Sequence, residues 1–295
     1  MTATLERDGS RPRSVTIVEV GPRDGLQNES GIVPADVKVA FVEALADAGL
    51  PVVEVSSFVR PDVIPQLADA DEVVRKGRRR PGVRYPVLVP NLRGMERAEA
   101  AGADAVAVFT AASEGFARAN IGMTIQASLD AFAPVLTRAA DLGWWRRGYV
   151  STAFGCPYDG PVDEARVVEV TTALLDLGCD EISVGDTIGV AEPADVRRVV
   201  EALLTAGIAT GRLALHLHDT RGRALDNVAQ GLDLGIATYD ASAGGTGGCP
   251  FAPGAPGNLA TESLCVRLDQ LGIEHGVDSS KVRRAAEMLR PYLAG

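Results

Sequence analysis

Short β-branched runs alternate with longer segments of helical periodicity along almost the whole chain. The runs predict eight strands, at residues 15–20, 52–57, 83–89, 103–109, 147–153, 181–185, 212–218 and 238–242. The segments between them predict helices at 35–48, 62–76, 113–142, 162–177, 193–206 and 225–234, with another between 89 and 103. Two further helices are predicted near 259–271 and 279–289. Repeated strand–helix units are typical of a (β/α)8 barrel, although a doubly wound parallel sheet would give the same alternation.

Polar residues at the ends of the predicted strands favour the barrel. They are Asp24, residues 54–57, Asp186, His216, His218 and Asn258, and they follow the first, second, sixth, seventh and eighth strands. Only a closed barrel brings the ends of the first and last strands to one mouth. We therefore predict an α/β fold, a (β/α)8 TIM barrel with extra C-terminal helices. It forms a single domain over residues 1–295, with a flexible N-terminus over about 1–14 and a glycine-rich lid loop over about 243–258.

Composition and charge narrow the classes of function. The 295 residues are 46% hydrophobic and 23% charged, which is ordinary globular usage, and the formal net charge is −10. This acidic balance argues against nucleic acid as a partner. No apolar run reaches the roughly 18 residues that a membrane span requires, and the polar first 14 residues lack the apolar core of a signal peptide. A cytoplasmic protein without a membrane partner is expected.

Two histidines, His216 and His218, stand two residues apart at the end of a predicted strand. Because residues i and i+2 of a strand point to the same face, both imidazoles are expected to enter the mouth of the barrel. The chain has only three histidines, so chance adjacency is a weak explanation. Two neutral imidazoles can bind a divalent ion; the alternative is a pair of hydrogen-bonded core histidines.

Asp24 lies just after the first predicted strand and adds a carboxylate to the two imidazoles. This set leaves open positions for water and substrate oxygens. It suits Mg²⁺ or Mn²⁺ as the divalent cofactor, and Zn²⁺ and Fe²⁺ are also compatible with it. The alternative for the Arg23–Asp24 pair is a local ion pair that shapes the loop.

The third signal is the glycine- and proline-rich segment 244–258, which follows the last predicted strand. Its glycines permit positive φ and close backbone approach, so the segment can fold over a ligand as a lid. The alternative is a flexible connector. A cysteine inside such a loop, Cys249, is not placed for core packing, so we expect its thiol to face the site. Asn258, at the end of the loop, could offer an amide oxygen to the metal.

Other features exclude an alternative function or lie outside the predicted site. A Schiff-base aldolase requires a lysine inside the barrel, and the three lysines, Lys38, Lys76 and Lys281, all lie on predicted helices. The basic run 75–80 falls on the N-terminal face, where a solvated turn is the better interpretation. The pair Trp144–Trp145 lies on the same face and suggests burial or a subunit contact, which leaves a homodimer open.

These motifs together resemble the 3-hydroxy-3-methylglutaryl-CoA (HMG-CoA) lyase family over about residues 15–277. The matching segments are residues 18–29, 57–59 with 65–66, 147–151, 155–158, 181–189, 216–220, 247–250 and 257–262. The last two correspond to the cysteine loop of the lyases. Related Claisen-type synthases share the Arg-Asp-Gly and His-x-His elements but not this loop.

The resemblance implies a TIM barrel that cleaves a 3-hydroxy-3-alkylglutaryl-CoA to acetyl-CoA and a 3-oxo acid, which is acetoacetate for the methyl substrate. The implied metal ligands are Asp24, His216, His218 and Asn258. The implied catalytic groups are the thiol of Cys249 with Arg23, Glu54, Asp186 and His216, and the implied substrate-binding residues are Arg23, Gln27 and Ser57. In that chemistry Arg23 stabilises the enolate oxyanion, Cys249 protonates the enolate carbon, and His216 or Asp186 is the candidate base.

Departures from the family pattern surround the cysteine loop rather than the metal set. Ala241, Ala243, Gly244 and Thr246 replace the usual Ser, Val, Ala and Leu, and Pro253 and Pro256 stiffen the loop. These changes leave the 3-alkyl group of the substrate open. A metal-dependent Claisen-type acyltransferase or aldolase of the same barrel group is the alternative function, and a non-catalytic binding protein is a third.

Overall fold

The computed structural model describes residues 11–248 and 257–293, and one sheet of nine strands forms its centre. The strands are β1 Thr16–Glu19, β2 Val52–Val53, β3 Ser56–Ser57, β4 Val87–Leu88, β5 Ala105–Ala111, β6 Trp145–Ser151, β7 Glu181–Asp186, β8 Leu213–Leu217 and β9 Thr238–Ala241. Their order is β2-β1-β9-β8-β7-β6-β5-β4-β3, and all neighbours are parallel. The predicted parallel arrangement is confirmed.

The two ends of this strand order meet, because β2 and β3 are halves of one extended segment. Val18 of β1 pairs with Val52 of β2, whereas Ser56 of β3 pairs with Val87 of β4. Between the halves, the amide of Glu54 donates to the first strand and the amide of Val55 donates to the segment before β4. The sheet is therefore a closed barrel of eight strands, as the sequence predicts, but the second strand, predicted as continuous over 52–57, is split in two.

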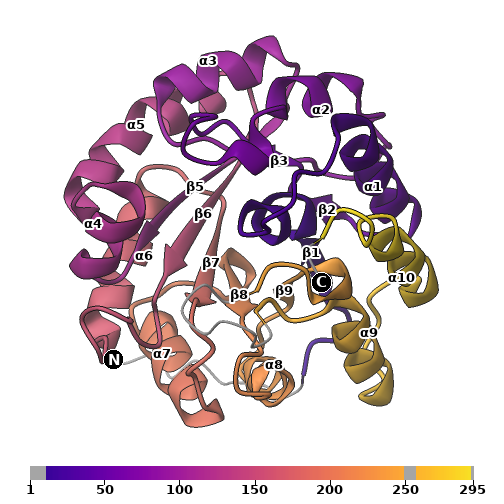
Figure 1. Cartoon of the computed structure of the whole chain (residues 1–295). Helices are drawn as coiled ribbons and strands as arrows, with labels where there is room; N and C mark the ends of the chain where they lie inside the picture. Colours follow the sequence, from indigo (N-terminus) through magenta and orange to yellow (C-terminus); the bar gives the residue numbers. More distant parts are fainter. Residues whose placement is uncertain (1–10, 249–256, 294–295) are drawn as a thin grey trace.

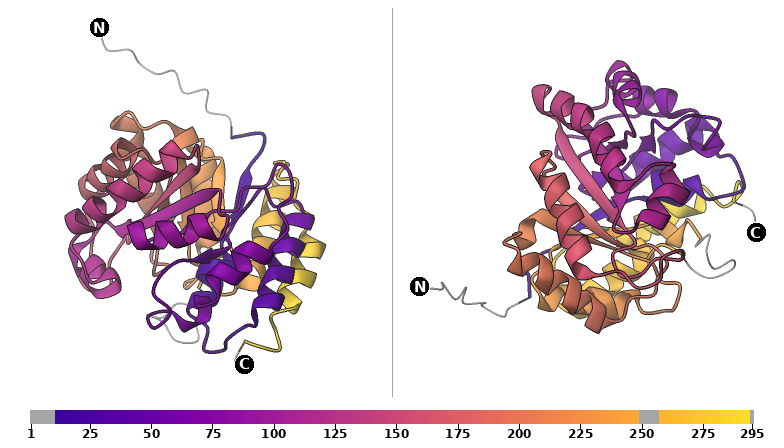
Figure 2. Two further views of the ribbon diagram at one scale, coloured as in Figure 1. Left: turned by 90° about the horizontal axis from the view of Figure 1, so that it is seen from above. Right: turned by 90° about the vertical axis from the view of Figure 1, so that its left-hand side faces the viewer.

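Among the described residues, ten α-helices form a ring around the strands (Figure 1), and they also flank the strands in the two views of Figure 2. They are α1 Ala35–Asp47, α2 Ala70–Lys76, α3 Leu92–Ala100, α4 Glu114–Ile121, α5 Ile125–Asp141, α6 Glu164–Asp176, α7 Pro193–Thr205, α8 Ala224–Asp233, α9 Thr261–Gln270 and α10 Ser279–Glu287. The two extra C-terminal helices pack beside each other, and α10 packs on α1. Within the described ranges, no helix is both long and apolar enough to cross a membrane.

Two predicted helices differ from the structure for local reasons. The stretch 113–142 forms two helices, because Gly122 adopts a left-handed conformation (φ +68°) that ends α4. Thr124 then caps α5 by accepting a hydrogen bond from the amide of Ala127. In the stretch 62–76 the α-helix begins only at Ala70, after a turn and the short 3₁₀ segment Pro65–Leu67.

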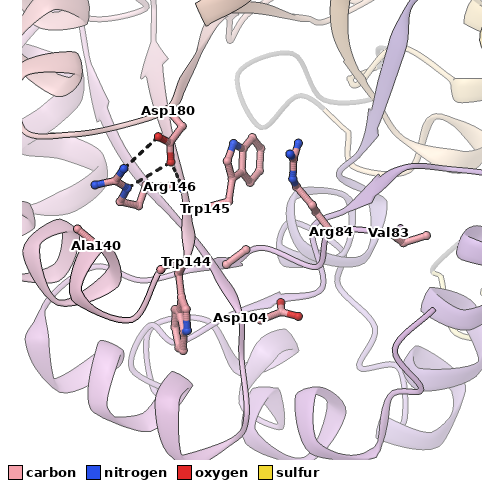
Figure 3. Close-up of a pocket in the computed structure, with 10 residues that line it drawn as sticks. Val83, Arg84, Asp104, Ala140, Trp144, Trp145, Arg146 and Asp180 are labelled. Carbon is pink, nitrogen blue, oxygen red and sulfur yellow. Dashed lines mark hydrogen bonds and ion pairs between the residues drawn. The ribbon is translucent and has the colours of Figure 1, made fainter. Parts of the chain in front are cut away.

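The N-terminal end of the barrel is closed by an indole. Trp145 packs against the inward-facing residues Val18 and Val52, and the guanidinium of Arg84 lies 5.1 Å from the centroid of its ring. Around it lies a cavity of about 550 Å³ whose wall includes the ion pair between Arg146 and Asp180 (Figure 3). This end lies opposite the mouth. Residues at this end of a barrel contribute to its stability rather than to its chemistry.

Candidate active site

A tight turn after β1 presents Arg23 and Asp24 to the C-terminal mouth. The backbone amides of Arg23, Asp24 and Gly25 all donate to the carbonyl oxygen of Val20, which gives a single π-helical turn over Gly21–Gly25. Such turns are frequent at functional sites. The first position requires glycine, because a Cβ on Gly21 would lie 2.6 Å from a carboxylate oxygen of the first strand. The periodicity of the sequence gives no sign of this turn.

The predicted metal residues converge at this mouth. His216 is on β8 and His218 follows it, and their ring centroids are 5.2 Å apart. One ligand atom each from Asp24, His216 and His218 lies within 4.8 Å of the others. The sequence argument from strand alternation is therefore confirmed in its geometry. This group could hold a metal ion, and its identity stays a prediction.

Asn258 reaches the same place from the far end of the glycine-rich segment. It forms an antiparallel bridge with His218, and its side-chain amide donates to Asp24 Oδ2 at 2.9 Å and to the carbonyl of Thr246 at 3.2 Å. The amide nitrogen, not the oxygen, thus faces Asp24. A half-turn of the amide exchanges the two atoms, so the residue is close enough to act as the predicted ligand.

The donor set fits a divalent ion. Burial and the neighbouring His216 lower the pKa of His218 to about 3, so its ring is neutral at neutral pH. Its buried Nδ1 has no hydrogen-bond partner within the described part of the chain, so this nitrogen is open to a ligand in the tautomer that protonates Nε2. Burial alone would raise the pKa of Asp24, but Arg23 and the two imidazoles outweigh it and hold it below the ordinary value. Burial alone would lower the pKa of His216, but Asp240 and Asp24 outweigh it and raise this pKa above the ordinary value, so an ion that binds His216 competes with a proton.

Arg23 and Glu54 form a buried ion pair directly behind Asp24. The Arg23 guanidinium donates to Glu54 Oε2 at 2.8 Å and to Asp24 Oδ1 at 2.6 Å. Glu54 is fully buried in the gap between β2 and β3, and burial raises its pKa although Arg23 opposes this. Tyr149 of β6 donates to the same Glu54 oxygen at 3.0 Å. The split of the second strand therefore places a carboxylate inside the barrel.

A second buried pair, which the sequence reasoning missed, lies on the opposite side of Tyr149. Arg147 of β6 is fully buried and donates to both oxygens of Asp240 on β9, at 2.6 and 3.1 Å. Asp240 Oδ2 lies 3.3 Å from His216 Nδ1. A signal exists in the sequence, since a charged residue stands in each of the two predicted strands, 147–153 and 238–242. The sequence does not show, however, which residue such a charged side chain pairs with, so it predicts no particular contact.

A cavity of about 400 Å³ opens at the mouth, and its lining divides into two halves. The polar half carries Arg23, Asp24, Gln27, Asn28, His216 and His218. The apolar half carries Leu88, Phe109, Phe116, Ile121, Met123, Phe132 and Val150. The predicted substrate-binding residue Gln27 borders the cavity and donates to Asp24 Oδ1 at 3.3 Å.

Three other predicted residues lie behind the cavity wall or outside the description. Asp186 accepts hydrogen bonds from the amides of Val190 and Ala191, and burial, opposed by these bonds, raises its pKa to about 6. Ser57 is buried on β3, where its hydroxyl accepts a weak hydrogen bond from a backbone amide. Cys249 lies outside the described residues, as does half of the predicted lid, so both stay predictions.

A (β/α)8 barrel with ionisable side chains gathered at its C-terminal mouth has the architecture of the barrel enzymes, and its carboxylate and two imidazoles could hold a metal ion. Within that class the chain belongs to the HMGL-like family, whose model matches residues 14–289. It is 50% identical over 281 residues to a bovine (Bos taurus) protein named hydroxymethylglutaryl-CoA lyase, mitochondrial, covering 95% of this chain and 86% of that one. A mouse (Mus musculus) relative at 49% identity over 278 residues, 94% of this chain and 81% of that one, is named 3-hydroxy-3-methylglutaryl-CoA lyase, cytoplasmic.

Solved structures agree with the family assignment. The HMG-CoA lyase of Brucella melitensis is 48% identical and superposes with a TM-score of 0.92, covering 95% of this chain and 98% of that one. The family resemblance inferred from the sequence motifs is confirmed, and so is the barrel fold.

Proposed function

We propose that this chain is a metal-dependent HMG-CoA lyase that cleaves HMG-CoA to acetyl-CoA and acetoacetate. The observation that carries the proposal is the meeting of Asp24, His216 and His218 at the mouth of a barrel of the HMGL-like family. Relatives at about 50% identity carry this enzyme name. The cavity of about 400 Å³ is large enough for the acyl part of such a substrate.

The residues that would hold the ion are Asp24, His216 and His218, with Asn258 as a fourth. We propose Mg²⁺ or Mn²⁺, because the carboxylate and amide oxygens and the open positions suit a hard cation. When bound, a divalent ion supplies Lewis-acid stabilisation of negative charge on the substrate's oxygens.

Arg23 is the group that we assign to the thioester oxygen. Its Nε–H and one N–H of each terminal nitrogen contact Glu54 and Asp24, which leaves two of its five donors without a partner among the described residues. It also lines the cavity. As the C2–C3 bond breaks, the electron pair moves onto the thioester as an enolate, and a fixed guanidinium stabilises that charge without reorganising.

Two proton transfers complete the reaction. The tertiary hydroxyl loses its proton as C2–C3 breaks, and C2 of the enolate gains one to give acetyl-CoA. We assign the second proton to the thiol of Cys249. For the first, Asp186 and His216 are the candidates. The Asp186 pKa of about 6 suits a base near neutral pH, whereas His216 already directs Nδ1 at Asp240.

The apolar half of the cavity concerns which alkyl group at C3 of the substrate the site accepts. Leu88 and Phe109 contribute a non-polar wall inside the mouth, in the same cavity as the polar half with Asp24 and His216. A methyl group fills only a small part of such a wall. We therefore propose that close analogues with a larger 3-alkyl group are also cleaved, to acetyl-CoA and the matching 3-oxo acid.

The test is acetyl-CoA release from HMG-CoA by metal-free protein, with and without added Mg²⁺ or Mn²⁺. Release that depends on the ion supports the lyase. No release by folded, metal-loaded protein would refute this substrate. The alternative, a Claisen-type acyltransferase or aldolase, would then be tested by supplying acetyl-CoA with 2-oxo acids and measuring free CoA.

The compartment and the assembly stay proposals. Relatives named cytoplasmic and mitochondrial match at nearly equal identity, and of these two compartments we propose the cytoplasm. The net charge of −10 argues against nucleic acid as a partner. We also propose a homodimer, because Trp144 and Trp145 are only half-buried on the N-terminal face. Light scattering of the purified protein tests it: a mass near 31 kDa would refute the dimer.

A further inference from the structure

We propose that Arg147 and Asp240 are positioning residues that fix the tautomer and the orientation of His216, so that its Nε2 faces the metal position. The inference rests on the proposed function, because it gives this nitrogen a metal to bind. Neither residue lines the mouth cavity, and the side chains of both have no exposed surface. They would therefore act on the site through His216 rather than on the substrate.

The hydrogen bonds around Asp240 leave one arrangement open to His216. Its Oδ1 accepts from Arg147 at 2.6 Å, and its Oδ2 accepts from Arg147 at 3.1 Å and from the hydroxyl of Ser183 at 2.7 Å. A carboxylate paired in this bidentate way is ionised and can only accept. The contact of 3.3 Å from His216 Nδ1 to Oδ2 is therefore a hydrogen bond only if Nδ1 carries the proton. Nε2 of the neutral ring then has its lone pair free.

Arg147 is itself held from three sides. Besides Asp240, its guanidinium donates to Glu181 at 2.8 Å and to the hydroxyl of Tyr149 at 2.8 Å. The contacts come from β6, β7 and β9, so the position of the carboxylate is set by three strands of the barrel. Rotation of Asp240 away from His216 would break this network.

Stability alone does not account for the pair. Moving two charges out of water costs several kcal/mol, and a buried ion pair often contributes no more than an apolar pair of the same size. A protein that needed only packing could fill the barrel interior with apolar side chains, as Val18 of β1 and Val52 of β2 do. The Arg147–Asp240 pair supplies what an apolar pair cannot, a hydrogen-bond acceptor of fixed direction at Nδ1.

The same network reaches the carboxylate ligand from the other side. Tyr149 accepts from Arg147 and donates to Glu54, which pairs with Arg23, which in turn donates to Asp24. Asp24 and His216 are thus the two ends of one buried chain of hydrogen bonds. No such contact fixes His218 Nδ1 in the described residues. The network therefore positions two of the three ligands.

The first measurement uses the metal-free wild-type protein and no substrate. Long-range ¹H–¹⁵N correlation spectra report which ring nitrogen of each histidine is protonated, and the chain has only three histidines to assign. At about pH 9, above the ordinary imidazole pKa, we expect His216 to be protonated at Nδ1. A ring protonated at Nε2 would overturn the inference whatever any variant does.

The second measurement compares two matched variants. Asp240→Asn is expected to populate the Nε2–H tautomer and to weaken Mn²⁺ binding, followed by electron paramagnetic resonance, by about 10- to 100-fold. Asp180→Asn is the control, because Asp180 makes a similar bidentate pair with Arg146 at the other end of the barrel. It should leave both readouts unchanged. Unaltered Mn²⁺ affinity in folded Asp240→Asn, or an equal loss in the control, would overturn the inference.

The two proposals fail separately. If the tautomer and the affinity behave as expected but HMG-CoA is not cleaved, only the assigned substrate is wrong. If HMG-CoA is cleaved in a metal-dependent way while His216 is protonated at Nε2, only the positioning role is wrong.

Discussion

Glu19 allows a quantitative test of how the mouth is held together. It is fully buried at the end of β1, and its carboxylate accepts hydrogen bonds from the amides of Gly21 at 2.9 Å and Ala243 at 2.8 Å and from the hydroxyl of Thr261 at 2.7 Å. It thereby connects the turn after β1 with both ends of the glycine-rich segment. Burial, opposed by these bonds, raises its pKa from 4.5 to about 7. The folded state therefore binds the proton more tightly than the unfolded state.

The sign and size of the effect follow from linkage. An acid whose pKa is raised on folding contributes its full stability below the unfolded value, near pH 4.5, and loses it as the pH rises to about 7. At about 1.4 kcal/mol per pH unit between the two values, the ionised carboxyl costs the folded state about 3 kcal/mol above pH 7. Glu19→Gln keeps the shape without the charge. Its amide oxygen can accept from the amides of Gly21 and Ala243, and its amide nitrogen can donate to the Thr261 hydroxyl, which reverses that hydrogen bond. We expect the variant to match wild type near pH 4 and to exceed its free energy of unfolding by about 3 kcal/mol at pH 8.

Urea unfolding at a series of pH values measures this difference. Glu287→Gln, which removes the same charge from an exposed position on α10, is the control and should change stability by less than about 0.5 kcal/mol throughout. A Glu19→Gln variant that is less stable than wild type at pH 8, or whose advantage does not depend on pH, would refute the assignment of a neutral carboxyl at this position.

The remaining predictions concern the mouth. Cys249→Ser should fold normally and lose at least about 100-fold in kcat for HMG-CoA cleavage, because a hydroxyl is a much poorer general acid; full activity would exclude the thiol from the reaction. Gly247→Ala should weaken Mn²⁺ binding and cost about 1–3 kcal/mol of stability, because Gly247 has φ +96° and an added Cβ would lie 2.8 Å from Asn258 Nδ2 and 2.9 Å from Gly25 Cα. Gly248→Ala, with no described atom within 4 Å of its added Cβ, should leave binding unchanged, and equal effects of the two changes would contradict the argument.

The barrel could be predicted because its causes are local and repeated. Most strands have a β-branched run and most helices a clear periodicity, and these patterns predicted most elements to within a few residues, the helix over 62–76 being an exception. His216 and His218 could be placed together for the same reason, since strand alternation is a local rule. The end of α4 at Gly122 was not predicted. A glycine inside a helical pattern does not by itself indicate a left-handed conformation, because tertiary contacts select that conformation.

The rest of the site depends on contacts across the barrel that no local pattern encodes. Arg147 meets Asp240 although 93 positions separate them, and Glu54 meets Tyr149 across 95. The family resemblance implied a catalytic role for Asp186, but no local pattern could show that its carboxylate also accepts hydrogen bonds from the loop that follows β7. A polar residue at a strand end is thus a good predictor of location at the mouth and a poor predictor of what its side chain contacts.

The pairing of the first strand with the last has a consequence for synthesis on the ribosome. Thr16 finds its β9 partner only at Thr238, about 220 residues later, which at about 5–20 residues per second is a wait on the order of ten to forty seconds. Asp24 leaves the ribosome early in this interval and His216, His218 and Asn258 near or after its end. The nascent chain therefore cannot assemble the proposed metal site before the ring is almost complete. An ion captured at the mouth would bind only to chains whose barrel has closed, and would stabilise the finished fold over every unfinished one.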